Sequence, residues 1–130
     1  MGPGENKPSE AAVVQFILDQ IESVPQLEAL LLLRNTQPKK WTTDELSRRL
    51  YISREAVRAL LDDLTRKRLV LLDSAESTYY YAAPEDQDRL IGLVDEIYRR
   101  QVVRVSQLIH SKPSAALRDF ARAFRFTKDE

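Results

Sequence analysis

The stretch from Trp41 to Tyr81 constrains the fold of this chain more than any other. Thr42 and Glu45 have the spacing of a capping box, in which two side chains satisfy the first backbone N–H groups of a helix; Thr43 is an equally suitable cap. Leu46 and Leu50 then recur at helical spacing and supply one buried side. The sequence therefore predicts a short helix that ends near residue 50.

A second helix is expected to follow at once. Tyr51 and Ile52 form the connecting turn, and Ser53 is a residue type that caps helix N-termini. The predicted inner face of this helix consists of Val57, Leu60, Leu61 and Leu64. The residues left facing outward are Ser53, Arg54, Glu55, Arg58, Ala59 and Asp62.

A β-hairpin is predicted after the second helix. The runs 69–72 and 78–82 favour strands, and the polar residues 73–77 separate them. Residues 39–42 can add a short strand anchored by Trp41. The consecutive tyrosines 79–81 allow a stacking platform for single-stranded bases, but alternate rings of a strand point to opposite sides, which favours a role in covering the core. Two helices, a tight turn and a hairpin are the layout of a winged helix-turn-helix, a unit that reads nucleic acids.

The string LSRRLYISREAVRALLDDLTRKRLV resembles the helix-turn-helix and the start of the wing in MarR-like and related bacterial winged-helix transcriptional regulators. The resemblance implies that the second helix, about residues 53–68, enters the major groove of duplex DNA and that the hairpin tip touches the minor groove. Arg54 and Arg58 are then the best candidates for base contacts, because a guanidinium can bond bidentately to guanine. Ser53 is expected to meet a phosphate or only to cap its helix. The implied DNA-binding residues are Arg48, Ser53, Arg54, Glu55, Arg58 and Ala59.

The chain departs from that family pattern at three places. Tyr51 stands where the turn usually has a small residue or glycine, so its backbone must avoid a positive φ or carry the strain. Arg68 stands where a glycine often ends the second helix. The hairpin tip, 73–77, is acidic and lacks the usual arginine, and Asp62 and Asp63 lie midway along the second helix. An acidic hairpin is expected to repel phosphate.

The charge pattern is polarised although the formal net charge is zero. Residues 41–72 contain seven Lys or Arg and five Asp or Glu, residues 73–98 contain one and seven, and residues 99–130 contain eight and three. Affinity for DNA grows with the number of cationic contacts to phosphate. This distribution allows a modest, salt-sensitive affinity for DNA.

The flanking segments predict helices with wide apolar faces. Residues 10–22 form one such helix, and a second begins with Pro25 in its first turn and ends near Asn35. After Pro84, a single unbroken helix is expected to run to about Ser111. Its two apolar stripes are Ile91, Val94, Tyr98, Val102, Val105 and Ile109, and, beside them, Leu90, Leu93, Ile97 and Leu108. This surplus predicts a homodimer; the alternative is that both stripes pack on the N-terminal helix of the same chain.

A last amphipathic helix is expected over residues 114–126. It is expected to dock on the dimer helices rather than on a membrane. The predicted organisation is a disordered leader over 1–9, an N-terminal helix with the winged helix-turn-helix over 10–84, and a C-terminal helical dimerisation segment over 85–130. The fold class is mainly α with a small β-hairpin wing, in which extra N- and C-terminal helices serve dimerisation.

Other kinds of chemistry find no support in the sequence. The chain has no cysteine, and its only histidine, His110, has no neighbour at metal-ligand spacing. The adjacent carboxylates Asp62 with Asp63 and Asp95 with Glu96 point about 100° apart on a helix, so they are expected to be solvated rather than catalytic. We expect no enzyme activity, no cofactor, no metal and a cytoplasmic location; the sequence does not show whether a small-molecule effector binds. The expected function is sequence-specific binding of duplex DNA by a homodimeric transcriptional regulator; the alternative is a winged-helix protein interaction or assembly module.

Overall fold

The structure, a computed structural model, describes residues 9–112. Most of this region is helical, with one antiparallel hairpin, which confirms the predicted fold class. The elements are α1 (Glu10–Gln20), α2 (Val24–Asn35), α3 (Thr43–Leu50), α4 (Arg54–Arg66), β1 (Val70–Asp73), β2 (Thr78–Tyr81), α5 (Glu85–Arg100) and α6 (Val102–Ser111). The expected leader, apart from Ser9, and the expected helix at 114–126 lie outside the described residues.

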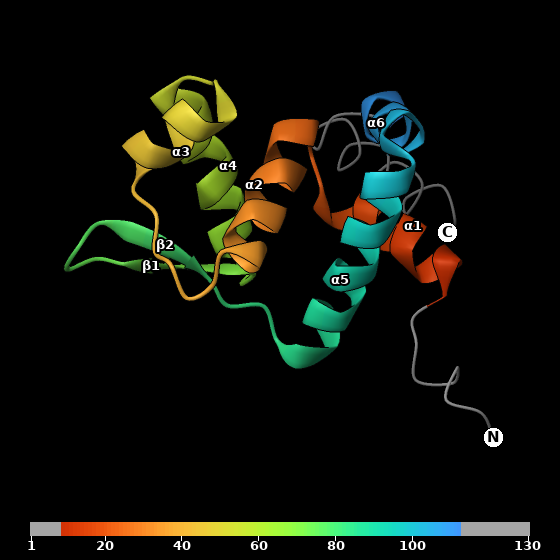
Figure 1. Cartoon of the computed structure of the whole chain (residues 1–130), viewed down its shortest axis with the longest axis horizontal. Coiled ribbons are helices and arrows are strands. Elements are labelled where there is room, and N and C mark those ends of the chain that lie inside the picture. Colours follow the sequence, from red (N-terminus) through yellow and green to blue (C-terminus); the bar gives the residue numbers. More distant parts are fainter. Residues whose placement is uncertain (1–8, 113–130) are drawn as a thin grey trace, which may run out of the picture.

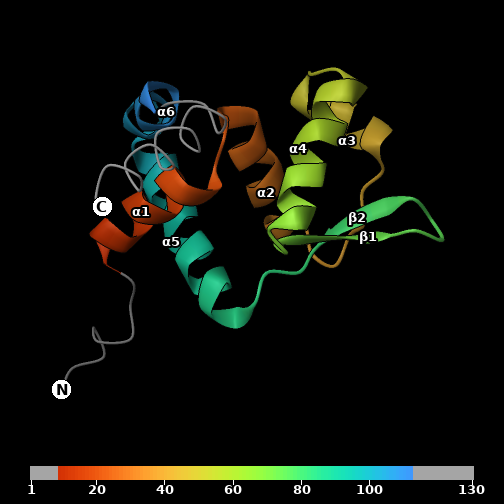
Figure 2. The ribbon, with the colours of Figure 1, turned by 180° about the vertical axis from the view of Figure 1, so that it is seen from behind.

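The elements form two groups on either side of α2. In Figures 1 and 2, α3, α4 and the hairpin lie at one end of the molecule, and α1, α5 and α6 lie at the other. Helix α2 contacts α3, α4 and β2, whereas α1 packs on α5 and α6. The hairpin projects away from the body beside α3 and α4.

The apolar residues of α2 and α4 form much of the buried core. The predicted inner face of α4 is buried at all four positions, Val57, Leu60, Leu61 and Leu64. Helix α2 lies between the two groups and is apolar on several sides; its buried apolar residues are Leu27, Ala29, Leu30, Leu31 and Leu33. Burial of such side chains contributes about 1.5–3 kcal/mol each and is the main force that holds the groups together.

Hydroxyl side chains begin the first four helices. The side-chain oxygens of Ser9, Ser23, Thr42 and Ser53 each accept a hydrogen bond from the backbone N–H three residues later, at 3.1–3.2 Å. At α3 the capping box is complete, because the backbone N–H of Thr42 also donates to Glu45 Oε1 at 2.9 Å. Thr42 rather than Thr43 is therefore the cap. Such caps stabilise a helix by about 1 kcal/mol each.

The hairpin is two paired strands with one additional bridge. Leu71 lies opposite Tyr80, and Asp73 lies opposite Thr78. The expected strand at 39–42 is reduced to a single bridge, in which Trp41 and Tyr79 exchange backbone hydrogen bonds of 2.9 and 2.7 Å. Trp41 is also fixed by its indole N–H, which donates to Thr36 Oγ1 at 2.9 Å. The hairpin is thus attached to the segment that precedes α3.

The prediction of one unbroken helix from residue 86 to 111 is wrong. Gln101, with φ −136° and ψ 55°, separates α5 from α6. Both helices pack on α1, and of the two apolar stripes Ile91, Val94, Val105 and Ile109 are buried within the chain. Val102 and Val103, next to the break, stay exposed. The apolar spacing continues across Gln101, so periodicity alone gave no sign of the change in direction.

Polar contacts join α5 to the rest of the molecule. Asp88 on α5 accepts hydrogen bonds from Arg34 Nε of α2 at 2.8 Å and from the Tyr81 hydroxyl of β2 at 2.7 Å. Burial and the bond to Asp88 raise the pKa of Tyr81 above its usual value. Asp95, which we expected to be solvated, is buried and accepts from Asn35 and Arg99. That expectation is wrong because α2 covers the side of α5 on which Asp95 lies.

Candidate nucleic-acid interface

The turn between α3 and α4 has a defined backbone. Tyr51 adopts φ 59° and ψ 41°, so of the two alternatives left open by the sequence its backbone carries a positive φ instead of avoiding it. The hydroxyl of Ser47 donates to the carbonyl of Ile52 at 2.6 Å, and the N–H of Ile52 donates to the carbonyl of Ser47 at 3.3 Å. These two bonds fix the direction in which α4 leaves the turn.

The expected contact residues lie on the outer surface of α3 and α4. All six, namely Arg48, Ser53, Arg54, Glu55, Arg58 and Ala59, are exposed. Ser53 is the N-cap of α4, so its hydroxyl is already an acceptor for the N–H of Ala56. Because the opposite face of α4 is buried, this row is the only side of the N-terminal half of the helix that a partner can reach.

The two candidate arginines of α4 are not equivalent. Arg54 Nε lies 3.0 Å from Asp44 Oδ1, in the first turn of α3. Both side chains are more than half exposed, so this ion pair contributes about 0–1 kcal/mol and a phosphate can compete for the guanidinium. Within residues 9–112, Arg58 has neither an ion pair nor a side-chain hydrogen bond. Asp44 was not among the candidate residues, because no sequence spacing brings the first turns of two successive helices together.

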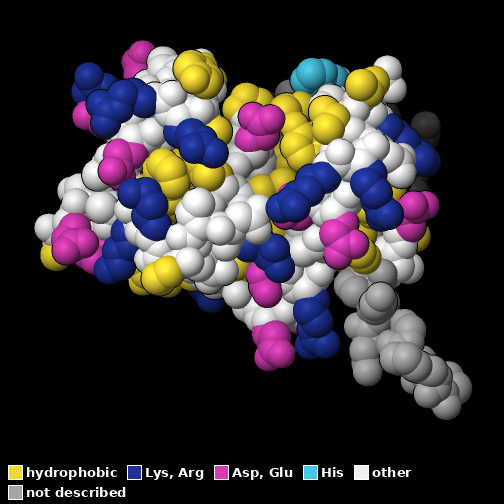
Figure 3. Space-filling model, viewed as in Figure 1, with side chains coloured by type: hydrophobic (Ala, Val, Ile, Leu, Met, Phe, Trp, Pro, Cys, Tyr) yellow, Lys and Arg dark blue, Asp and Glu magenta, His cyan; other side chains and the backbone are white. Residues whose placement is uncertain are grey.

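The negative charge of the hairpin is partly neutralised by a lysine outside it. Lys40 Nζ lies 2.8 Å from Asp73 Oδ2, and this hydrogen bond holds the pKa of the Asp73 carboxyl below its usual value. Lys40 also lies over the ring of Tyr80, 5.3 Å from its centroid. Glu76 is the remaining exposed carboxylate in the turn of the hairpin. On the face of this end that Figure 3 shows, basic and acidic side chains are interspersed and do not form one continuous positive surface.

The C-terminal half of α4 is tied to the protein itself. Asp63, expected to be solvated, accepts hydrogen bonds from Gln26 at 2.8 Å and Arg66 at 2.6 Å, and pairs with Lys67 at 2.6 Å. Burial alone would raise the pKa of Asp63, but these three donors outweigh burial and lower it. Asp62, its neighbour, is exposed as expected. The prediction for Asp63 is wrong because Gln26, buried on α2, reaches this edge of α4.

Other kinds of site find little support in the described residues. No group of three or more His, Cys, Asp or Glu within residues 9–112 is placed to hold a metal ion. His110 is exposed in the last turn of α6, where the sequence placed it. Among the helices of the described region, none is both long and apolar enough to cross a membrane.

No protein-family model and no curated protein matches the chain. Solved structures do. A MarR family protein from Bacillus stearothermophilus is 21% identical with a TM-score of 0.51, and the match covers 92% of this chain and 82% of that one. The chain shares the MarR winged-helix fold. S. aureus MepR, solved in a complex with DNA, is 19% identical with a TM-score of 0.52, covering 92% and 84%. A MarR family transcription regulator is 21% identical with a TM-score of 0.52, covering 92% and 80%.

The likeness to MarR structures confirms the resemblance that residues 46–70 indicated, at the level of the fold. It extends over most of the chain, so the flanking helices as well as the winged helix-turn-helix belong to the shared architecture.

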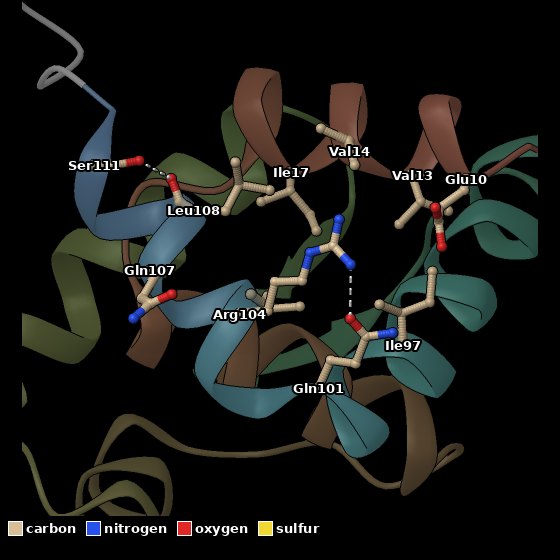
Figure 4. Close-up of a pocket in the computed structure, with 11 residues that line it drawn as sticks. Glu10, Val13, Val14, Ile17, Ile97, Gln101, Arg104, Gln107, Leu108 and Ser111 are labelled. Atoms are coloured by element: carbon tan, nitrogen blue, oxygen red, sulfur yellow. Dashed lines mark hydrogen bonds between the residues drawn. The ribbon is translucent and has the colours of Figure 1, made fainter.

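A pocket of about 350 Å³ lies at the other end of this MarR-type fold. Its walls come from α1, α5 and α6 and are mostly apolar (Figure 4). The guanidinium of Arg104 extends across the pocket and donates to Gln101 Oε1 at 3.2 Å. The apolar lining residues are Val13, Val14, Ile17, Ile97, Val105 and Leu108. The pocket can accept an apolar group, but neither α3 nor α4 contributes to its walls.

Proposed function

We propose that this protein is a DNA-binding transcription regulator that presents the N-terminal half of α4, residues 53–59, to the major groove of duplex DNA. The observation that carries the proposal is the outward row on α4, where Arg54 and Arg58 project from a helix whose other face is buried. A helix of this kind fits the major groove, and guanidinium groups are the commonest readers of guanine there. Glu55 and Ala59 lie on the same face and would contribute to sequence selection.

The regulator is proposed to act as a homodimer. Helix α1 packs on both α5 and α6, but two apolar residues at their junction remain exposed. These are Val102, 46% exposed, and Val103, 68% exposed. A two-fold axis through this end would present two copies of α4 to successive turns of a palindromic site. Light scattering tests the assembly: a mass of two chains supports the proposal, and a strict monomer at micromolar concentration contradicts it.

DNA binding is tested by titrating a labelled random duplex at about 50 and 200 mM salt. Arg54→Ala with Arg58→Ala should reduce the affinity at least tenfold and make it less sensitive to salt, because two positive charges are removed from the surface that faces the DNA. The matched control is Arg66→Ala with Arg89→Ala, which makes the same change in net charge at exposed positions outside both the N-terminal half of α4 and the junction of α5 and α6. Equal losses in both double variants would mean that the effect is general electrostatics rather than the surface of α4.

A second candidate function is a protein interaction module. It is favoured by β1, where Leu71 and Leu72 are 42% and 46% exposed, and by the pairing of Arg54 with Asp44. Exposed leucines on a strand suit a protein partner better than a phosphate backbone. The same titration separates the two functions, because only the regulator binds duplex DNA at low salt.

A further inference from the structure

Tyr51 is unusual in two independent ways. Its φ of 59° lies in the left-handed region, where glycine is favoured and an aromatic residue is strained. Its side chain is also 92% exposed, so the ring gains almost nothing from burial in return. A glycine at this position would relieve the backbone and remove the exposed ring. A residue that is unfavourable in both respects points to a contact outside the chain.

The surroundings of Tyr51 restrict what that contact can be. Arg48 and Arg49 are exposed in the last turn of α3, and Arg54 opens α4 on the other side of the turn. Leu50 and Ile52, the chain neighbours of Tyr51, are partly buried and pack against the core. The exposed ring therefore projects from a turn that exposed arginines flank in the sequence and whose apolar neighbours are half-buried, which favours an anionic partner over an apolar protein surface.

The turn also fixes the backbone position from which the ring projects. The bonds between Ser47 and Ile52 fix the backbone on both sides of residue 51, and the N–H of Tyr51 donates to the carbonyl of Ser47. A tyrosine has few rotatable bonds, so little conformational entropy is lost when its ring makes a contact.

We propose that Tyr51 contacts the DNA backbone beside the groove that α4 enters, with its hydroxyl donating to a phosphate oxygen and its ring lying against the adjacent sugar. This inference rests on the proposed function. Tyrosine is one of the side chains that proteins use for phosphate contacts, which set the position of a recognition helix without reading the sequence. Because the phenol is uncharged, this contact releases no counterion.

The test compares Tyr51→Phe with Tyr98→Phe. Both remove one phenol hydroxyl, but Tyr98 lies on α5 and donates to Glu28. Tyr51→Phe should weaken binding of a random duplex about fivefold, the value of one net hydrogen bond, and by the same factor at low and moderate salt. Arg58→Ala should instead change the salt slope by about one unit. Tyr98→Phe should leave the affinity unchanged.

Tyr51→Gly provides the second readout. Because it relieves the positive φ, it should raise the melting temperature while weakening DNA binding by more than Tyr51→Phe does. Wild-type affinity in both Tyr51 variants would overturn the inference and leave the proposed function intact. If the wild-type protein itself fails to bind duplex DNA at low salt, the proposed function and this inference both fall.

Discussion

Charged residues have different roles in the two halves of α4. In the N-terminal half, the charged side chains face solvent, and within residues 9–112 their one ion pair is the exposed pair between Arg54 and Asp44. Asp63, in the C-terminal half, and Lys67, which follows it, are largely buried. They pair with each other, and they bond to Gln26 of α2 and Gln20 of α1, respectively. A charge on one helix is therefore available to a partner or used by the fold, depending on what packs beside it.

This contrast locates the candidate interface better than net charge does. The chain carries equal numbers of acidic and basic residues, which taken alone argues against binding DNA. However, Asp63 and Asp73 are neutralised by Lys67 and Lys40 within the protein, so neither carboxylate opposes a phosphate at full strength. A nucleic acid would contact the exposed residues of the N-terminal half of α4 and the turn that precedes this helix.

The largest effect is expected from removing Asp63. Asp63→Ala should lower the free energy of unfolding by about 2 kcal/mol, because the variant removes the carboxylate that accepts from the buried Gln26 amide and pairs with Lys67. Asp62→Ala, its exposed neighbour, should stay within about 0.5 kcal/mol. Urea denaturation measures both. Similar values for the two variants would remove the distinction between solvated and structural carboxylates on α4.

A smaller loss of stability is expected at Lys67, one helical turn after Asp63. Lys67→Met should cost about 1 kcal/mol, because Lys67 Nζ donates to the carbonyl of Gln20 as well as pairing with Asp63. Arg66→Met is the control: its side chain is 72% exposed and should be nearly silent. If Arg66→Met were the more damaging change, the C-terminal half of α4 would not be anchored as described.

The contribution of Asp63 should also depend on pH. The pKa of Asp63 is lowered in the folded protein and returns to its usual value of 3.8 on unfolding. Its stabilisation is therefore complete well above pH 3.8, begins to fall near that pH, and is lost as the pH falls through the lower pKa of the folded protein. The difference in unfolding free energy between wild type and Asp63→Asn should therefore shrink below pH 4. A difference that stays constant from pH 7 to pH 3 would show that the carboxylate charge is not involved.

The smallest effect on stability is expected at Asp44. Asp44→Asn should change the unfolding free energy by less than about 0.5 kcal/mol, because its pair with Arg54 is exposed. DNA affinity should rise about threefold, since the variant frees Arg54 and removes a negative charge near the phosphates. The affinity is measured with the random duplex. A fall in affinity would indicate that Asp44 holds Arg54 in its productive position instead of competing for it.

The sequence correctly predicted the features that depend on residue spacing within a single helix. Periodicity identified the buried face of α4, the Thr42–Glu45 pair marked the start of α3, and Ser53 marked the start of α4. These features are local: they rest on contacts three or four residues apart or on one helix face meeting the core. The exposed positions of the candidate site followed from the same periodicity, because a residue opposite the buried face is outside.

Contacts between distant elements could not be predicted in this way. Nothing in the residue spacing shows that Gln26 meets Asp63, that Asp44 meets Arg54, or that Arg34 and Tyr81 share Asp88. The break at Gln101 was missed for a related reason, since no glycine or proline marks it and the apolar pattern runs on. Such contacts are decided by how whole helices pack, and the sequence of one helix does not contain that information.

In the proposed complex, DNA contacts the N-terminal half of α4 and not its C-terminal half. An NMR titration of the ¹⁵N-labelled protein with duplex DNA at low salt tests this proposal. We expect the largest amide shift changes on residues 51–59 and little change on residues 63–67 and on α5. Changes concentrated on Leu71 and Leu72 of β1, or on 63–67 with residues 51–59 unaffected, would contradict it.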